Sequence, residues 1–249
     1  MDLGLRDQVA VVTGAGRGIG AEIASALAEE GCRVAIWDRD TQPAEEVAER
    51  IRRAGGDAFA VTGDVTKRAE VDAAVAQILA RFNTVHILVN NAGFSMDAPF
   101  VEMSEKQWHS VIDVCLSGVF HCTQAIAPNM IGQHYGRIIN ISSRAQLGDL
   151  TKSNYVAAKA GVVGFTRALS LELAKDEITV NALAPGFIRT ERAMKSPYFA
   201  QMDARSILRT PIQRPGQARD VANAALFLAA KSSSFITGEV LYVSGGRYA

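Results

Sequence analysis

The chain has 249 residues, 48% of them hydrophobic, which is enough to bury a sizeable core. Its 26 basic and 26 acidic residues balance, and no basic block or basic amphipathic segment stands out, so we expect neither nucleic acid nor a membrane surface as a partner. Three cysteines without a Cys-x-x-Cys pair are typical of a reducing compartment. With no secretory leader and no apolar run that looks long enough to span a bilayer, we expect a cytoplasmic protein.

Short apolar strands alternate with helical patterns along the chain. The first strand runs into a glycine turn and a helix that Gly31 ends, and Pro43 suits the first turn of the second helix. The expected strands are 9–13, 33–37, 58–61, 86–89, 138–141, 178–183 and 240–243. After the first helix, the expected helices are 43–54, 67–82, 105–131 with interruptions near Gly118 and Pro128, 154–174 and 219–230.

This alternation predicts an α/β fold with a single doubly wound parallel sheet of about seven strands and helices on both faces. No Pro/Gly/Ser-rich linker and no repeat divides the chain, so we expect one domain over residues 1–249. The segment 187–215 has poor periodicity, and we interpret it as a mobile substrate loop.

Polar or glycine-rich turns follow six consecutive strands. They are Gly14–Gly20, Asp38, Asp64, Asn91-Ala92-Gly93, Ser142-Ser143 and Pro185-Gly186. Doubly wound sheets bind ligands outside the carboxyl ends of their strands. One edge of the sheet is therefore the predicted site.

Tyr155 and Lys159 lie one helical turn apart and are the predicted source of the chemistry. A free phenol titrates at about pH 10, which is too high for acid/base work at neutral pH, and a nearby ammonium favours the phenolate. Alone, the pair could be a surface tyrosine stacked on a lysine stem. Together with the glycine turn, it indicates proton exchange with an alcohol or carbonyl beside a nicotinamide.

The glycines at 14, 18 and 20 let a helix N-terminus approach a pyrophosphate. Asp38 is placed to accept hydrogen bonds from the adenine ribose, which favours NAD, because a 2′-phosphate would face it as a like charge. Arg17 and Arg39 are guanidinium groups that could bind that phosphate instead, so NADP stays possible.

At this point the chain resembles the short-chain dehydrogenase/reductases along nearly its whole length. The motifs that carry the resemblance are Thr13-Gly14-x-x-x-Gly18-x-Gly20, Asp64-Val65, Asn90-Asn91-Ala92-Gly93, Ser142-Ser143, Tyr155-x-x-x-Lys159, Pro185-Gly186 and the tail Thr237-Gly238…Val243-Ser244-Gly245-Gly246. The tail has serine at 244 where the family usually has aspartate.

The resemblance implies roles for individual residues. Tyr155 would be the acid/base, Lys159 would support it and hold the nicotinamide ribose, and a serine would bind the substrate oxygen. The strand register from Gly136 gives Ser143 for that serine, with a one-residue deletion in the following loop, and the commoner spacing back from Tyr155 gives Ser142; we favour Ser143. The implied cofactor-binding residues are Gly14, Arg17, Gly18, Ile19, Gly20, Asp38, Asp64, Val65, Asn91, Ala92, Gly93, Tyr155, Lys159, Pro185, Gly186, Ile188 and Thr190; no metal is expected.

One departure concerns Cys115, at a position where most members of the family have asparagine. That asparagine helps to fix a helix kink and a water next to the lysine. Cysteine is smaller and a poor hydrogen-bonding group, and its packing is that of a small buried hydrophobe.

The leading hypothesis is an NAD-dependent oxidoreductase of a secondary alcohol or ketone, a small molecule held among apolar side chains such as Phe94, Met96 and Leu147. The first alternative is an NADPH-dependent 3-oxoacyl-carrier-protein reductase, which His134 and Leu171 disfavour, because the resemblance places basic carrier-docking residues there. The second is a non-catalytic dinucleotide-binding sensor. The resemblance also implies a homotetramer, with the two long helices paired across one dyad.

Overall fold

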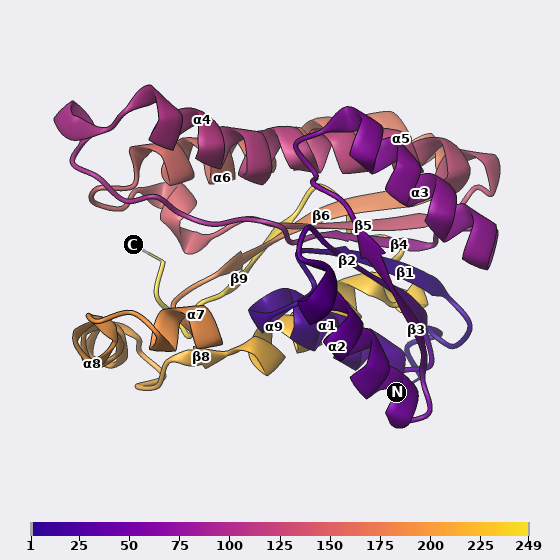
Figure 1. Cartoon of the computed structure of the whole chain (residues 1–249), viewed down its shortest axis with the longest axis horizontal. Helices are drawn as coiled ribbons and strands as arrows, with labels where there is room; N and C mark the ends of the chain where they lie inside the picture. Colours follow the sequence, from indigo (N-terminus) through magenta and orange to yellow (C-terminus); the bar gives the residue numbers. More distant parts are fainter. Residues whose placement is uncertain (1, 249) are drawn as a thin grey trace.

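A computed structural model describes residues 2–248, and within them one parallel sheet crosses the molecule (Figure 1). Its seven strands lie in the order β3-β2-β1-β4-β5-β6-β9, so the strand order reverses between β1 and β4. The strands are β1 Val9–Thr13, β2 Arg33–Asp38, β3 Asp57–Thr62, β4 Ile87–Asn90, β5 Gly136–Ile141, β6 Ile178–Pro185 and β9 Val240–Val243. The predicted fold class is confirmed, and each predicted strand is present with bounds shifted by at most two residues.

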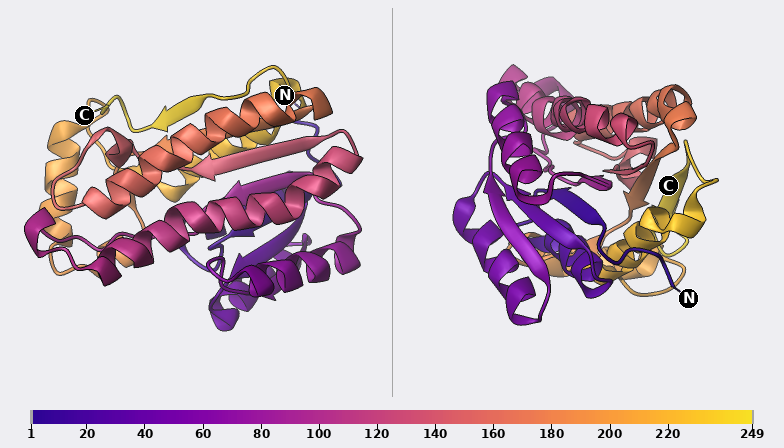
Figure 2. Two further views of the ribbon diagram at one scale, coloured as in Figure 1. Left: turned by 90° about the horizontal axis from the view of Figure 1, so that it is seen from above. Right: turned by 90° about the vertical axis from the view of Figure 1, so that its right-hand side faces the viewer.

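Helices cover both faces of the sheet (Figures 1 and 2). One face carries α1 Gly18–Glu29, α2 Thr41–Arg53 and α9 Ala218–Ala229. The other carries α3 Arg68–Phe82, α5 Gly118–Gly132 and α6 Ser153–Leu173, with α4 Glu105–Ile112 beside α6. Because both faces are covered, the central strands are apolar at nearly every position rather than alternating.

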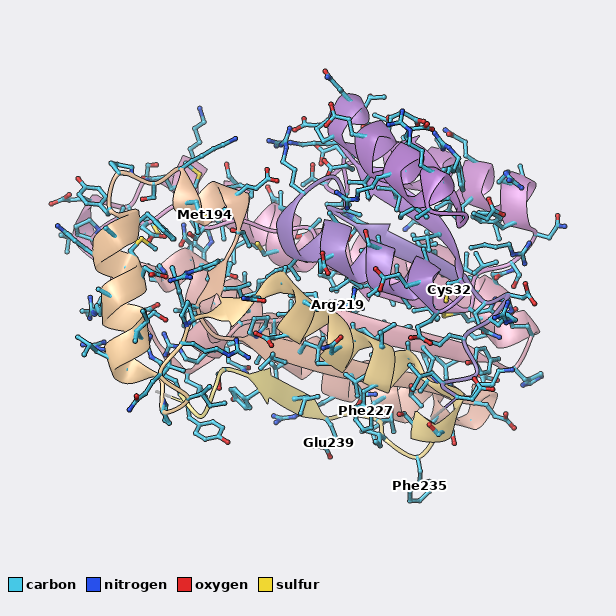
Figure 3. The ribbon with its side chains drawn as sticks, turned by 90° about the horizontal axis from the view of Figure 1, so that it is seen from below. Cys32, Met194, Arg219, Phe227, Phe235 and Glu239 are labelled. Atoms are coloured by element: carbon cyan, nitrogen blue, oxygen red, sulfur yellow. The ribbon has the colours of Figure 1, made fainter. Side chains whose placement is uncertain are left out.

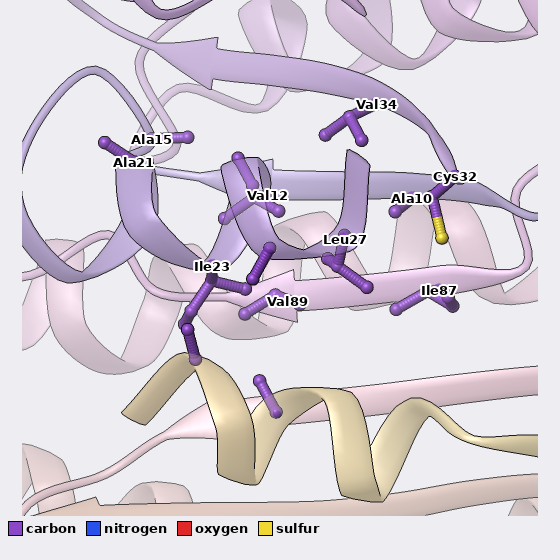
Figure 4. Packing of buried hydrophobic residues seen from close by; sticks show 14 of the residues in the cluster. Ala10, Val12, Ala15, Ala21, Ile23, Leu27, Cys32, Val34, Ile87 and Val89 are labelled. Atoms are coloured by element: carbon purple, nitrogen blue, oxygen red, sulfur yellow. The ribbon is translucent and has the colours of Figure 1, made fainter. Parts of the chain in front are cut away.

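Strand β1 shows how the two cores divide. Ala10 and Val12 point to the α1 and α9 side, where Ile23 and Leu27 of α1 meet them (Figure 4). Val9 and Val11 belong to the cluster on the opposite face. These four side chains are fully buried, because successive strand side chains alternate between two faces that are both covered by helices.

The segment 187–215 is more regular than its sequence indicated. It contains β7 Ile188–Arg189, α7 Glu191–Met194 and α8 Phe199–Arg209, and β7 pairs with β8 Gly216–Gln217. Arg189 holds α8 through a two-pronged ion pair with Asp203, at 2.7 and 2.5 Å. The prediction missed α8 because it rests on few core contacts: within it, only Ser206 is buried.

The predicted long helix 105–131 is divided once. A π-helical turn, Asp113–Ser117, separates α4 from α5 and ends immediately before Gly118. The expected interruption at Pro128 is wrong, because α5 continues through it to Gly132, anchored by buried Ile126 and Met130 on either side. The helical stretch Glu105–Gly132 is long and apolar enough to cross a membrane, although we expected no run of that length from the sequence. The core helices of soluble proteins pass the same test. Buried residues of α5 pack against the sheet.

Candidate active site

A cleft of about 750 Å³ opens at the carboxyl ends of the strands, where the strand order reverses. Most of the predicted cofactor residues line it: Gly14, Arg17, Gly18, Ile19, Asp38, Asp64, Val65, Asn91, Ala92, Gly93, Tyr155, Lys159 and Thr190. Among the described residues, Gly20, Ser143, Pro185, Gly186 and Ile188 are not part of its lining. The Ile188 side chain lies in the core, so only its backbone is available to a ligand.

The glycine turn is shaped by steric necessity. Gly14 and Gly18 have φ of +61° and +58°, which favours glycine. A Cβ on Gly14 would lie 2.8 Å from the Ala92 backbone. The Asn91 amide holds the turn in place by donating to the carbonyls of Thr13 and Gly14, at 2.9 and 3.0 Å. Asn91 therefore builds the floor of the cleft, with its amide nitrogen already occupied by the turn.

The cleft suits a dinucleotide. The first turn of α1 carries no acidic side chain, so its free amides are available to a pyrophosphate. A Cβ on Gly18 would meet the Thr190 methyl group at 3.5 Å, in ordinary van der Waals contact. The residues present therefore fit a nicotinamide dinucleotide, whose phosphates Gly18 and Ile19 would hold.

Asp38, at the end of β2, also lines the cleft. Its Oδ2 accepts a hydrogen bond from the Gly16 amide at 2.9 Å and its Oδ1 accepts one from the Asp40 amide at 3.1 Å. Both nearby guanidiniums have a carboxylate partner, because Arg17 and Arg39 lie 3.1 and 3.8 Å from Asp40. The charges around this end of the cleft therefore cancel.

Asp64, after β3, remains charged. Burial acts to raise the pKa of Asp64, but the hydrogen bonds from the Thr66 amide at 2.9 Å and hydroxyl at 2.8 Å, together with the charges of Lys67 and Arg39, outweigh it, so the pKa is lowered. Trp37 closes the same region with its indole donating to the Gly63 carbonyl at 2.9 Å. Trp37 and Gly63 were not predicted as site residues.

Lys159 is buried, with 2% of its surface exposed, and its Nζ donates to the Ile141 carbonyl at 2.6 Å. The same Nζ lies 5.6 Å from the ring centroid of Tyr155. A Cβ on Gly93 would meet Nζ at 3.4 Å, so the absence of a side chain there leaves the ammonium facing the cleft. The structure thus brings the predicted pair together in one cleft.

The two candidate serines have different environments. Ser142 is 2% exposed and its hydroxyl donates to the Lys159 carbonyl at 2.9 Å. Ser143 is half-buried, in extended backbone, and its Oγ accepts from the Ala145 amide at 3.1 Å. The Ser143 hydroxyl proton is not used in that contact, which favours Ser143 as the serine available to a substrate.

Cys115 lies in the π-helical turn and is fully buried. Its thiol donates to the Phe94 carbonyl at 3.4 Å, and a Cβ on Gly93 would lie 3.2 Å from Sγ. The helix irregularity therefore exists here without an asparagine side chain, and the thiol packs beside the loop that borders Lys159.

Asn154 was missed by the sequence analysis. It is fully buried, and its amide donates to the carbonyls of Met96 and Gln107 at 3.0 and 3.1 Å. It ties the loop after β4 and helix α4 to the start of α6, one residue before Tyr155. Arg39, considered from the sequence as a partner for a 2′-phosphate, also lines the cleft, and the lining residues that were not predicted include Asp40, Val114, Ile141, Glu191, Arg192 and Lys195. Their positions depend on tertiary packing, and no short motif marks them.

Known proteins resemble this chain over almost its full length. A family model described as Enoyl-(Acyl carrier protein) reductase matches residues 14–247. The 3-oxoacyl-[acyl-carrier-protein] reductase FabG of Staphylococcus aureus is 42% identical over 241 residues, covering 96% of this chain and 97% of the relative. Subunit BbsD of (2S)-[(R)-hydroxy(phenyl)methyl]succinyl-CoA dehydrogenase from Thauera aromatica is 41% identical and covers 98% of each chain.

Solved structures agree. A protein from Agrobacterium tumefaciens described as a gluconate dehydrogenase has a TM-score of 0.94 at 35% identity, covering 100% of this chain and 99% of that one. A gluconate 5-dehydrogenase from Burkholderia cenocepacia, in complex with NADP and tartrate, has a TM-score of 0.90 at 38% identity, covering 97% of this chain and 96% of its own. With its sheet, its nucleotide cleft and these relatives, the chain belongs to the short-chain dehydrogenase/reductase family and is an NAD(P)-dependent oxidoreductase of alcohol and keto groups.

Proposed function

We propose that the protein oxidises a secondary alcohol, or reduces the matching ketone, with Tyr155 as the group that exchanges the proton. The observation that carries this proposal is the position of Lys159: a buried ammonium, held by the Ile141 carbonyl, close to the Tyr155 ring in the cleft that fits a dinucleotide.

A nicotinamide held in the cleft would supply or accept the hydride. In the oxidation the phenolate of Tyr155 takes the alcohol proton, and in the reduction its hydroxyl gives a proton to the ketone oxygen; the ammonium of Lys159 stabilises the phenolate form through its charge. Ser143 donates its hydroxyl proton to the same substrate oxygen. The Asn154 amide network holds Tyr155 in register by fixing the first turn of α6.

We propose that NAD is the preferred cofactor. Asp38 presents a carboxylate at the cleft, and the carboxylate of Asp40 lies within ion-pair distance of both Arg17 and Arg39. A 2′-phosphate would add negative charge where two carboxylates stand. The structure of the Burkholderia relative contains NADP, so the preference of this chain has to be measured with both cofactors.

The relationship to FabG makes reduction of a carrier-bound 3-oxoacyl group the second candidate. By resemblance, a carrier protein would dock on basic residues, but the corresponding surface of this chain is not basic. Leu171 there is 83% exposed and apolar, and His134 lies 3.8 Å from the carboxylate of Asp176. A free small molecule is therefore the favoured substrate.

We further propose a homotetramer located in the cytoplasm, with neither nucleic acid nor membrane as a partner. Phe120 and Phe165 meet edge to face on α5 and α6, and Phe120 is 42% exposed. On a different side, Phe235 projects fully exposed near α9, together with Phe227 (Figure 3). Two separate apolar surfaces are what two dyads require. The unpaired, buried cysteines are consistent with a reducing compartment.

The direct test is a spectrophotometric panel of secondary alcohols and ketones, free and as carrier thioesters, assayed with both nicotinamide cofactors. The proposal expects turnover of free substrates with a kcat/KM above that of carrier thioesters. Turnover restricted to the carrier-bound form would support the second candidate, and cofactor binding without any turnover would support the sensor.

A further inference from the structure

Five cationic side chains line the cleft, and they are Arg17, Arg39, Lys159, Arg192 and Lys195. Three of them are held by the protein itself. Arg17 and Arg39 lie 3.1 and 3.8 Å from carboxylate oxygens of Asp40. The ammonium of Lys159 donates to the Ile141 carbonyl. Within residues 2–248, neither Arg192 nor Lys195 has a carboxylate at ion-pair distance, and neither side chain forms a hydrogen bond.

Helix α7 carries Arg192 to the cleft, and the chain around this helix is ordered by specific contacts. The Thr190 hydroxyl begins the helix by accepting from the Ala193 amide at 3.3 Å. Directly before it, Arg189 forms the two-pronged ion pair with Asp203 of α8. Figure 1 shows α7 beside α8, at the carboxyl ends of the strands. The position of Arg192 therefore follows from the fold of this segment.

The guanidinium of Arg192 lies over the ring of Phe94, 5.8 Å from the ring centroid. Phe94 also lines the cleft and comes from the loop after β4, so this contact joins two of its walls. A guanidinium stacked on a ring uses its face and leaves the N–H donors in its plane free. Because no protein group within residues 2–248 takes these donors, Arg192 presents them in a fixed orientation to a ligand.

The contact with Phe94 places Arg192 at the catalytic end of the cleft. Phe94 and Tyr155 pack against the same small buried cluster. Thr190, two residues before Arg192, lies instead beside Gly18, where the cofactor phosphates would bind. Helix α7 therefore leads from the phosphate end of the cleft toward the end where Tyr155 lies.

The wall that α7 contributes has a net positive charge. Its charged lining side chains are the carboxylate of Glu191 and the cations of Arg192 and Lys195, which caps the helix. Neither cation lies within ion-pair distance of Glu191. A guanidinium binds a carboxylate or a phosphate through two parallel hydrogen bonds, so these are the groups that match the unused donors of Arg192.

We propose that Arg192 determines substrate specificity by binding an anionic oxygen group of the substrate, a carboxylate or a phosphate, while Tyr155 exchanges the proton with the alcohol or keto group. This inference rests on the proposed function and names its substrate class. Lys195 adds positive charge to the same wall. In the oxidation, the carbinol carbon gives a hydride to the oxidised cofactor and the hydroxyl proton goes to the phenolate of Tyr155, while the anionic group is unchanged.

The test compares anionic compounds with their uncharged counterparts on the intact enzyme with its cofactor. Malate and 3-hydroxybutyrate are paired with their amides, gluconate with glucitol, and glycerol 3-phosphate with glycerol, in turnover and in calorimetric binding. We expect at least one anion to exceed its counterpart by roughly tenfold or more in kcat/KM, since charge-assisted hydrogen bonds are the strong ones. The carboxylate and phosphate pairs show which of the two groups is bound. Added salt should raise the KM of the anion and leave that of the neutral compound unchanged.

The variants separate the charge of Arg192 from its geometry. Arg192→Gln should raise the KM for the anion roughly tenfold, with kcat nearly unchanged and neutral substrates unaffected. Arg192→Lys keeps the charge without the planar fork and should recover part of the loss. Phe94→Leu removes the ring beneath the guanidinium, so the ratio of kcat/KM for the anion to that for its neutral counterpart should fall, by less than in Arg192→Gln.

Arg205→Gln is the matched control. Arg205 is an exposed arginine of the neighbouring helix α8 and is not part of the cleft lining, so its loss removes the same charge from the same region. The preference for the anion should be unchanged in this variant. Circular dichroism checks that each variant is folded.

Three results would overturn the inference. The first is equal binding and turnover of anions and neutral counterparts in all pairs. The second is a KM increase in Arg192→Gln for anion and neutral compound alike. The third is a weaker Kd for the cofactor in Arg192→Gln with an unchanged preference among substrates, which would assign the guanidinium to the cofactor phosphates.

The proposed function and this inference can fail separately. If neutral alcohols or ketones are turned over in a Tyr155-dependent way without any preference for anions, the proposed function stands and this inference fails. If nothing is turned over, the proposed function fails. Calorimetric binding of an anion to the enzyme with its cofactor, lost in Arg192→Gln and kept in Arg205→Gln, would then still support the anion site, and its absence would overturn it.

Discussion

Replacing Asp38 by alanine tests the origin of cofactor preference. The Asp38→Ala change removes the carboxylate at the end of strand β2 that lines the cleft, and with it the proposed acceptor for the adenine-ribose hydroxyls. A hydrogen bond to a charged group contributes ~1.5–3 kcal/mol, which corresponds to a factor of roughly 10–150. We therefore expect kcat/KM for NAD to fall by about that factor.

The ratio of the kcat/KM values for NAD and NADP tests the role of Asp38 better than the fall in kcat/KM for NAD alone. Asp38 also accepts from the amides of Gly16 and Asp40, at 2.9 and 3.1 Å, so its removal loosens the glycine turn for either cofactor. That structural loss cancels in the ratio of kcat/KM for NAD to kcat/KM for NADP. The ratio should fall at least roughly tenfold, since like-charge repulsion of the 2′-phosphate disappears as well.

Asp40→Ala provides the matched comparison. It leaves Asp38 in place and frees Arg17 and Arg39, which are exposed at 61% and 70%. Exposed ion pairs contribute ~0–1 kcal/mol, so the ratio should change by no more than about fivefold. A wild-type protein that prefers NADP, or an Asp38→Ala protein with an unchanged ratio, would refute the assignment of Asp38.

Three further predictions concern other parts of the molecule. In Cys115→Asn the amide can donate to the Phe94 carbonyl in place of the thiol, so kcat should equal or exceed that of wild type. A fall in both kcat and melting temperature would show instead that the packed π-helical turn cannot accept the larger side chain. Burial lowers the pKa of His86 below its ordinary 6.5, and the neutral Nδ1 accepts a hydrogen bond from the Val9 amide. The free energy of unfolding should therefore be intact above pH 6.5 and decrease as the pH falls below it, and it should depend less on pH in His86→Asn. The same pH dependence of unfolding in wild type and His86→Asn would contradict this. Light scattering should give a tetramer at micromolar concentration, and a monomer would remove the proposed assembly.

Local patterns predicted most of this fold and much of the cleft. The strand β1, the glycine turn and the Tyr155/Lys159 pair are recognisable because their residues are adjacent in sequence. The π-helical turn at Cys115 was only partly predicted, since no residue in it breaks a helix by itself. Helix α8 was missed because an ion pair from Arg189 and one buried serine hold it rather than an apolar stripe.

Long-range contacts account for what the sequence could not show. Asn154 acts on Met96 and Gln107, 58 and 47 residues away, so nothing near it marks its role. The sequence favoured Ser143 over Ser142 but could not show that the Ser142 hydroxyl donates to the carbonyl of Lys159, 17 residues away.

The most direct measurement of the central claim is a comparison of cofactor binding and turnover in Tyr155→Phe. The change removes one hydroxyl and leaves the aromatic ring and the Lys159 contact to Ile141 in place. Our account predicts that the Kd for NAD(H) stays within several-fold of wild type while turnover of any accepted alcohol or ketone falls to background. Retention of most of the wild-type kcat, at unchanged cofactor affinity, would contradict Tyr155 as the proton-exchanging group.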